Sequence, residues 1–184
     1  MFPKAHAAAY VMMAWRIAYC KINYPQAYYA AYFSIRATGF SYELMCQGKK
    51  ICEQNLADYK NRQKDKSNFS AKDKDTLRDL KLVQEMYARG LEFEPIDLYR
   101  AHSRNFQVID GKIMPSLSSI DGLGEKAADA IMEAARHGEF LSQDDFRART
   151  KVSKTVIELM DRLGILGDMP ESNQISIFDL IGAE

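Results

Sequence analysis

The chain has 184 residues, of which 47% are hydrophobic and 27% are charged, and its 25 Lys and Arg residues balance its 25 Asp and Glu residues. This hydrophobicity at zero net charge excludes a chain that is disordered throughout. No apolar run reaches the ~18–20 residues of a membrane span, and the first residues show no secretory pattern. We therefore expect a cytoplasmic protein with no membrane partner.

The cysteines and histidines show no metal-ligand spacing. Cys20, Cys46 and Cys52 fit neither a disulfide framework nor a Cys-x-x-Cys site, so we expect reduced, structural thiols. No histidine has a second His or Cys at helical ligand spacing. The sequence thus predicts no metal-binding residues.

The zero net charge hides a gradient along the chain. Residues 1–45 carry four basic and one acidic residue (+3), and residues 46–104 carry 13 and 10 (+3). Residues 105–167 carry eight and ten (−2), and residues 168–184 carry none and four (−4). A basic front and an acidic tail indicate different partners.

Helices are predicted through the first half of the chain. The Ala-rich run over residues 5–24 predicts a mostly buried helix, and residues 26–38 predict a second one with Gly39 as its C-cap. Helical texture resumes over residues 42–47, and the lysine-rich stretch 49–75 is weakly periodic, with 61–74 as the expected loop. Ser70 is placed to N-cap a further helix that Gly90 closes. Its predicted apolar face consists of Leu77, Leu80, Val83, Met86 and Tyr87.

The second half mixes a small β element with short helices. Asp110-Gly111 predicts a tight hairpin turn between two short strands. Helices are expected over residues 125–136, 142–149 and 153–163, and the last 17 residues carry too few apolar residues for a packed element. The fold class is therefore mainly α with a small β element and a flexible C-terminal tail.

Residues 119–127 form a glycine-rich segment before a helix, and it has two interpretations. Gly122, Gly124 and Ala127 satisfy the dinucleotide pattern G-x-G-x-x-G/A, with Asp144 and Asp145 about 20 residues later, but that motif needs a strand on each side. The favoured interpretation is a helix-hairpin-helix, in which Ile120 and Leu123 anchor a turn whose glycine N–H groups face a DNA phosphate.

A degenerate second copy is expected over residues 151–166. The candidate DNA-binding residues of the two copies are Gly122, Leu123, Gly124, Lys126, Ser153, Lys154 and Thr155. The alternative is a helical domain that merely uses Gly-Leu-Gly as a turn. The −2 charge of the segment favours that alternative, because phosphate binding usually needs a basic face.

Both ends of the chain offer further candidates. Lys4, His6 and Tyr10 open the first helix, and His6 and Tyr10 share a face because they are four residues apart; the plain alternative is an amphipathic helix with a core Tyr. In the tail, Gln174 followed by Ile177 and Phe178 suits a groove on a partner. The tail's alternative is to fold back onto its own domain.

Several of these segments together resemble one family. The run Phe2-Pro3-Lys4-Ala5-His6-Ala7-Ala8-Ala9-Tyr10, the aromatic residues 28–37, the hairpins at 119–124 and 151–155, and Gln174-Ile175-Ser176-Ile177-Phe178 resemble the C-terminal segment of the PolC-type alpha subunit of bacterial DNA polymerase III. The likeness covers nearly the whole chain in order and is weakest over residues 47–74. Ile175 and Ile177 stand where family members usually have Leu.

The resemblance implies four parts: the end of the polymerase fingers (1–90), a short β-hairpin connector (91–115), a tandem helix-hairpin-helix DNA-binding domain (116–167) and a sliding-clamp-binding tail (168–184). It implies nucleotide or template contacts from Lys4, His6 and Tyr10, and clamp contacts from Gln174 to Phe178. The expected partners are duplex DNA through its phosphates, the incoming dNTP in the complete enzyme and the sliding clamp.

No part of the chain matches the family's catalytic palm, so no catalytic residue is expected here. We expect the isolated segment to be inactive and to bind no cofactor, with Mg²⁺ held in the palm of the complete polymerase. Without that neighbour, residues 1–45 are expected to expose an apolar face. The competing hypothesis is a stand-alone, non-catalytic helix-hairpin-helix DNA-binding protein.

Overall fold

A computed structural model describes residues 3–64 and 68–172. Over these residues the fold is mainly helical with one small sheet, which confirms the predicted fold class. The helices are α1 Lys4–Asn23, α2 Pro25–Ile35, α3 Tyr42–Met45, α4 Lys49–Arg62, α5 Ala71–Ala88, α6 Glu125–Arg136, α7 Gln143–Thr150 and α8 Lys154–Arg162, with a 3-10 turn η1 at Leu117–Ser119. The strands are β1 Gln107–Ile109 and β2 Lys112–Met114. No helix in the described ranges is both long and apolar enough to cross a bilayer.

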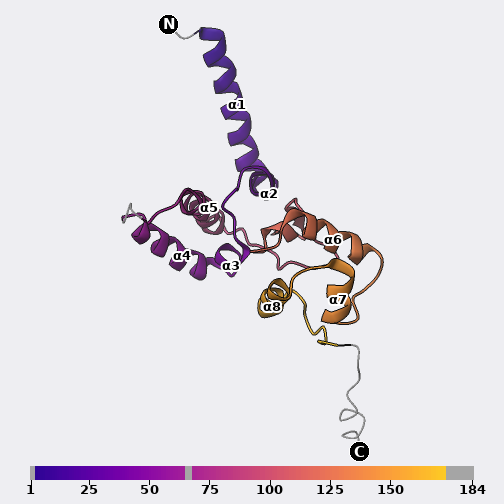
Figure 1. The fold of residues 1–184 in the computed structure, drawn as a ribbon. Coiled ribbons are helices and arrows are strands. Elements are labelled where there is room, and N and C mark those ends of the chain that lie inside the picture. The colour runs from indigo at the N-terminus through magenta and orange to yellow at the C-terminus, as the bar shows by residue number, and fades with distance from the viewer. Residues whose placement is uncertain (1–2, 65–67, 173–184) are drawn as a thin grey trace, which may run out of the picture.

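α1 projects from the rest of the molecule (Figure 1). It is tied in near its C-terminal end, where Lys21 pairs with Glu85 at 2.8 Å. None of its residues is buried, and Trp15 is 72% exposed. The prediction of a mostly buried helix is therefore wrong, because no described element packs along its length. The expected exposed apolar face is confirmed on α1.

The second helix ends earlier than its sequence predicts, and Gly39 is not its C-cap. α2 ends at Ile35, and Arg36 occupies the C-cap position. A Cβ placed on Gly39 would lie 2.3 Å from the backbone nitrogen of Thr76 in α5. Glycine is needed at this position because two backbone segments touch there.

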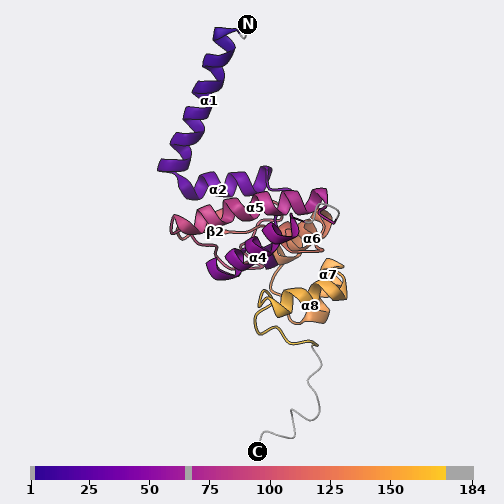
Figure 2. The same cartoon turned by 90° about the vertical axis from the view of Figure 1, so that its left-hand side faces the viewer.

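α4 and α5 pack against each other as an antiparallel pair (Figure 2). α4 buries only Cys52 and Leu56, which explains why the weakly periodic stretch before the expected loop did not predict a helix. α5 begins with a complete capping box between Ser70 and Asp73, as the Ser70 prediction anticipates. All five residues of its predicted apolar face are buried.

The predicted hairpin is present and packs against α2. Val108 pairs with Ile113 across the two antiparallel strands, and Asp110 and Gly111 have φ angles of 51° and 81°. Two positive φ values are those of a type I′ turn, which matches the twist of its strands. The backbone N–H of Phe106 donates to Ser34 Oγ of α2 at 2.8 Å.

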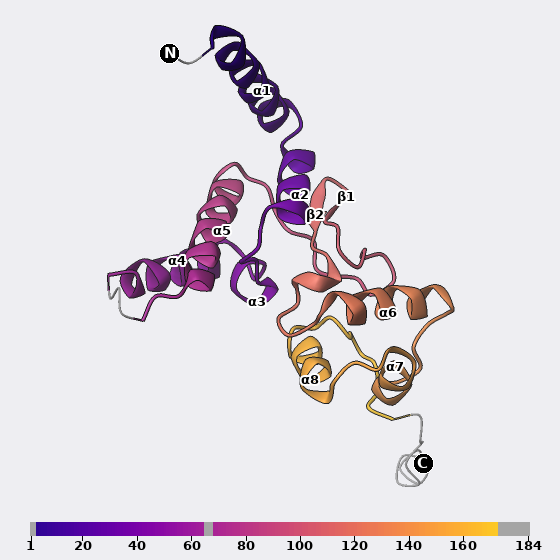
Figure 3. The ribbon, with the colours of Figure 1, turned by 45° about the horizontal axis from the view of Figure 1, so that its top comes forward.

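Two hydrophobic cores meet at β2. One core joins α2, α4, α5 and the aromatic residues beside the hairpin, and the other joins α6, α7 and α8. Ile113 belongs to the first core and Met114 to the second, because successive strand residues point to opposite sides. α6, α7 and α8 lie close together on the far side of the hairpin from α2 (Figure 3).

The described part of the acidic tail, residues 168–172, returns to the start of α7. The backbone N–H groups of Gln143 and Asp144 donate to the carbonyls of Pro170 and Glu171 at 2.8 and 3.1 Å. This contact satisfies amides at a helix start, which have no partner within their own helix.

Candidate nucleic-acid interface

The first hairpin, residues 120–124, is a turn held by two buried side chains. Ile120 and Leu123 are buried, and the N–H of Leu123 donates to the carbonyl of Ile120 at 3.1 Å. Gly122 has φ 79°, a conformation that favours glycine. Leu123 therefore anchors the turn, and its N–H is already occupied.

The two glycines of the first hairpin face solvent. Gly124 is the N-cap of α6, and its N–H and that of Gly122 form no hydrogen bond with any described residue. These N–H groups and the first N–H groups of α6 form a patch of partial positive charge. Lys126, in the first turn of α6, is exposed beside it.

The second hairpin, residues 150–153, repeats this geometry without glycine. Lys151 has φ 61°, a left-handed conformation like that of Gly122. Val152, which follows it, is buried like Leu123 in the first hairpin. Ser153 caps α8 with φ −68° and ψ 150°, close to the −72° and 158° of Gly124. Each hairpin thus consists of a left-handed residue, a buried anchor and an extended residue before a helix.

The two hairpins lie against each other. A Cβ placed on Gly122 would meet Val156 Cγ2, in the first turn of α8, at 3.6 Å. Ala128 and Ile131 of α6 and Val156 and Ile157 of α8 share one core. The starts of α6 and α8 are therefore neighbouring surfaces, while Lys154 and Thr155 are exposed on α8.

Most acidic residues beside the hairpins are paired within the protein. Arg104 binds Glu125 at 3.1 Å and also pairs with Asp129. Hydrogen bonds from Arg104 and Ser103 hold the pKa of Asp129 below its ordinary value. Ser41 Oγ donates to Asp121 in the first hairpin. The −2 charge of this segment is therefore a poor guide to the charge that the hairpins present.

Three basic side chains at this surface form no ion pair with any described residue: Lys126, Arg147 and Lys151. Arg147, Lys151 and Ser153 line a shallow concavity beside the second hairpin, together with Asp144. The predicted DNA-binding residues include neither Arg147 nor Lys151, although Lys151 lies in the predicted second copy. Alignment of the two hairpins would have found Lys151, because it occupies the position of Gly122.

The other predicted site residues lie elsewhere. Lys4, His6 and Tyr10 are exposed on α1, at the opposite end of the molecule from α7 and α8 (Figure 1). The rings of His6 and Tyr10 meet at a centroid distance of 4.5 Å, so they do share one face. Gln174, Ile175, Ser176, Ile177 and Phe178 lie outside the described residues.

The dinucleotide interpretation of the first hairpin is wrong. The segment follows η1 and precedes α6 and α7, whereas that motif needs a strand before its glycines and another after its helix. The two-stranded β1–β2 sheet is the whole of the sheet structure within the described residues. Within the same residues, no group of three or more His, Cys, Asp or Glu side chains is arranged to hold a metal ion.

The comparisons with known proteins agree with this geometry. Residues 90–175 match the family described as the helix-hairpin-helix motif, and both hairpins lie within this range. The chain is also 45% identical over 178 residues to a protein of Caldanaerobacter subterraneus subsp. tengcongensis named DNA polymerase III PolC-type. Proteins of the same name from Clostridium perfringens and Streptococcus sanguinis are 46% and 44% identical.

Each of these alignments covers 97% of this chain and 12% of the relative. The chain is therefore similar to one segment of proteins named DNA polymerase III PolC-type, and it spans about an eighth of their length. This confirms the family resemblance that its sequence shows.

Proposed function

We propose that this chain is a DNA-binding segment of a replicative polymerase of the PolC type. The observation that carries the proposal is the pair of equivalent hairpins, each with an exposed helix start, set side by side at α6 and α8. Two such sites suit two phosphates of one duplex, and they would bind without reading base sequence. Template-directed synthesis would belong to the complete enzyme in the cytoplasm.

Salt-dependent binding of a plain duplex tests this proposal. The 184-residue chain should bind a 20-bp duplex, with log K falling linearly with log salt, because phosphate contacts release counterions. Lys126→Ala combined with Lys154→Ala should weaken binding and flatten the slope by about 2 units. Lys50→Ala combined with Lys81→Ala removes the same charge from α4 and α5 as the control. Equal losses for both pairs would mean that the hairpins are not the binding site.

The nucleotide contacts of α1 are a second part of the proposal. His6 and Tyr10 would face the base pair and Lys4 the phosphates. The exposed apolar length of α1 supports a place inside a larger polymerase, where parts beyond this 12% segment would cover it. Replacing His6 and Tyr10 by Ala in the complete polymerase should reduce nucleotide incorporation, and unchanged incorporation would refute these contacts.

Clamp tethering is the third part of the proposal and rests on the tail sequence. Gln174 would donate and accept hydrogen bonds while Ile177 and Phe178 fill apolar pockets of a sliding clamp. A peptide of residues 168–184 should capture the clamp and lose it on Gln174→Ala with Phe178→Ala. Binding that survives both changes would refute the tail's role.

We propose that the two Mg²⁺ ions that such a polymerase needs for nucleotidyl transfer bind in its palm, a part whose motif this sequence does not resemble.

A further inference from the structure

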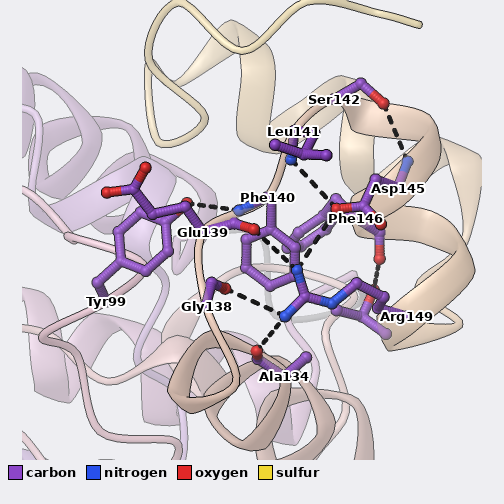
Figure 4. Close-up of polar contacts among 11 residues, drawn as sticks. Tyr99, Ala134, Gly138, Glu139, Phe140, Leu141, Ser142, Asp145, Phe146 and Arg149 are labelled. Atoms are coloured by element: carbon purple, nitrogen blue, oxygen red, sulfur yellow. Dashed lines mark hydrogen bonds and ion pairs between the residues drawn. The ribbon is translucent and has the colours of Figure 1, made fainter. Parts of the chain in front are cut away.

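Arg149, near the end of α7, holds the C-terminal end of α6 (Figure 4). Its guanidinium donates to the carbonyls of Gly138 at 3.1 Å and Glu139 at 2.9 Å, and also to the carbonyl of Ala134. The carbonyl of Ala134 also accepts from the N–H of His137 at 3.1 Å, whereas Gly138 and Glu139 lie beyond the helix. One side chain therefore binds three carbonyls at the turn between α6 and α7.

The guanidinium is also fixed from its other sides. It lies over the Phe140 ring at 4.4 Å and pairs with Asp145 at 3.4 Å. Phe140 is buried and packs edge-on against Phe146 at a centroid distance of 4.8 Å. The planar guanidinium has donors on two edges and an aromatic ring against its face, so these contacts fix its position. A lysine ammonium cannot form the same set of contacts.

The position of Arg149 in the chain connects the two hairpins. α6 begins at the first hairpin and ends at the carbonyls that Arg149 binds. Arg149 itself stands two residues before Lys151, where the second hairpin turns. In addition to the core contacts between α6 and α8, one helix and one arginine thus connect the two hairpins.

We propose that Arg149 is a positioning residue that fixes the second hairpin relative to the first, so that both bind one duplex at the same time. The inference rests on the proposed DNA-binding function. Binding through the first hairpin places the second at the highest effective concentration near its phosphate when their separation is held at the span between the two phosphates. Loss of the Arg149 contacts should replace simultaneous binding at both hairpins by two weaker, independent contacts.

A double-mutant cycle in the full 184-residue chain tests the proposal. Arg149→Lys should lower the affinity for a 20-bp duplex at least about tenfold and flatten its salt dependence. In the wild type, Lys154→Ala should weaken binding several-fold. In the Arg149→Lys background the same change should have almost no effect, whereas Lys126→Ala should still weaken binding.

A purely structural role gives a different result. Arg149→Lys would then lower the urea midpoint only, and Lys154→Ala would cost the same factor in both backgrounds at a temperature where both are folded, which would overturn the proposal. Phe140→Leu keeps the arginine but removes its ring, and it replaces Arg149→Lys in the cycle if that variant does not fold. Arg136→Lys, on the exposed side of α6, is the control and should change nothing.

The outcome is separable from a failure of the proposed function. If Lys126→Ala and Lys154→Ala have no effect in the wild type, the hairpins do not bind DNA and the function itself fails. If they act in the wild type and act equally in the Arg149→Lys chain, only the positioning role fails.

Discussion

The backbone N–H of Gly39 donates a 2.8 Å hydrogen bond to Oδ2 of Asp79, a carboxylate with no exposed surface. Arg78 Nε donates to the other oxygen at 3.1 Å. Burial raises the pKa of Asp79 above its ordinary value, and the bonds from Gly39 and Arg78 act in the opposite direction. This contact locks the segment after α2 onto α5. Ser41, two residues further on, holds Asp121 of the first hairpin.

Gly39→Ala should destabilise the fold by about 2–3 kcal/mol, because its Cβ would overlap the backbone at Thr76 and force α5 to move. Urea unfolding measures the change. Gly124→Ala is the matched control, since a Cβ there meets nothing within 4 Å, and it should cost no more than about 1 kcal/mol as an N-cap change. A Gly39→Ala chain as stable as the control would rule out the close approach.

Asp79→Asn should change how stability depends on pH. The pKa of Asp79 is raised on folding. At a pH between the unfolded and the folded pKa, the folded state therefore keeps a proton that the unfolded state has released. The contribution of Asp79 to the free energy of unfolding is therefore present at low pH and is lost as pH rises through the raised pKa. The Asn variant does not titrate and keeps an acceptor for Gly39.

The measurement is the free energy of unfolding at several points between about pH 4 and pH 7. The value for Asp79→Asn minus that for the wild type should increase across this range. Asp58→Asn, an exposed change on α4, serves as the comparison. Parallel curves for wild type and Asp79→Asn would contradict the raised pKa.

Lys151→Gly should make the protein more stable and its DNA binding weaker. A left-handed conformation costs a non-glycine residue about 1–2 kcal/mol, and glycine's extra freedom in the unfolded chain offsets part of that gain. We expect a net gain of up to about 1 kcal/mol in urea unfolding. The same change removes a charge from the second hairpin, so the slope of log K against log salt should flatten by about 1 unit.

This prediction is specific because stability should increase while DNA affinity decreases. Lys50→Ala removes one charge from α4 and should leave the salt slope unchanged. A Lys151→Gly chain that binds as tightly as the wild type would show that this lysine has only a turn-forming role.

Arg104→Gln should weaken duplex binding about three- to tenfold at low salt. The change leaves Glu125 and Asp129 without their partner beside the first hairpin. The loss should shrink as salt increases, because exposed charges are screened. Arg100→Gln is the matched control, since Arg100 pairs with Asp110 in the β turn. Equal losses from both changes would assign the effect to overall charge.

Local patterns in the sequence predicted much of the fold. The Ser70 cap, the apolar face of α5, the Asp110-Gly111 turn and the bounds of α6 all follow from short-range spacing. α4 was missed because only two of its residues are buried, so its apolar pattern is too sparse to show a face.

The errors of prediction arise where distant residues decide the structure. Gly39 resembles a helix C-cap in sequence, and only the approach of Thr76, far along the chain, shows its role. α1 is exposed because no described element packs along its length, and its Ala-rich sequence does not show this. In the candidate site, the glycine hairpin was found from its own residues. Lys151 takes a backbone conformation that lysine rarely adopts, so its residue type does not indicate the turn and only its alignment with Gly122 does.

β2 is a single wall shared by two cores, with Ile113 on one side and Met114 on the other. Unfolding of either core would expose one side of that strand to solvent. The two cores should therefore unfold as one cooperative unit, and amides of β2 should exchange with solvent only through global opening. A force applied at the two hairpins would reach the helices of the first core through this strand.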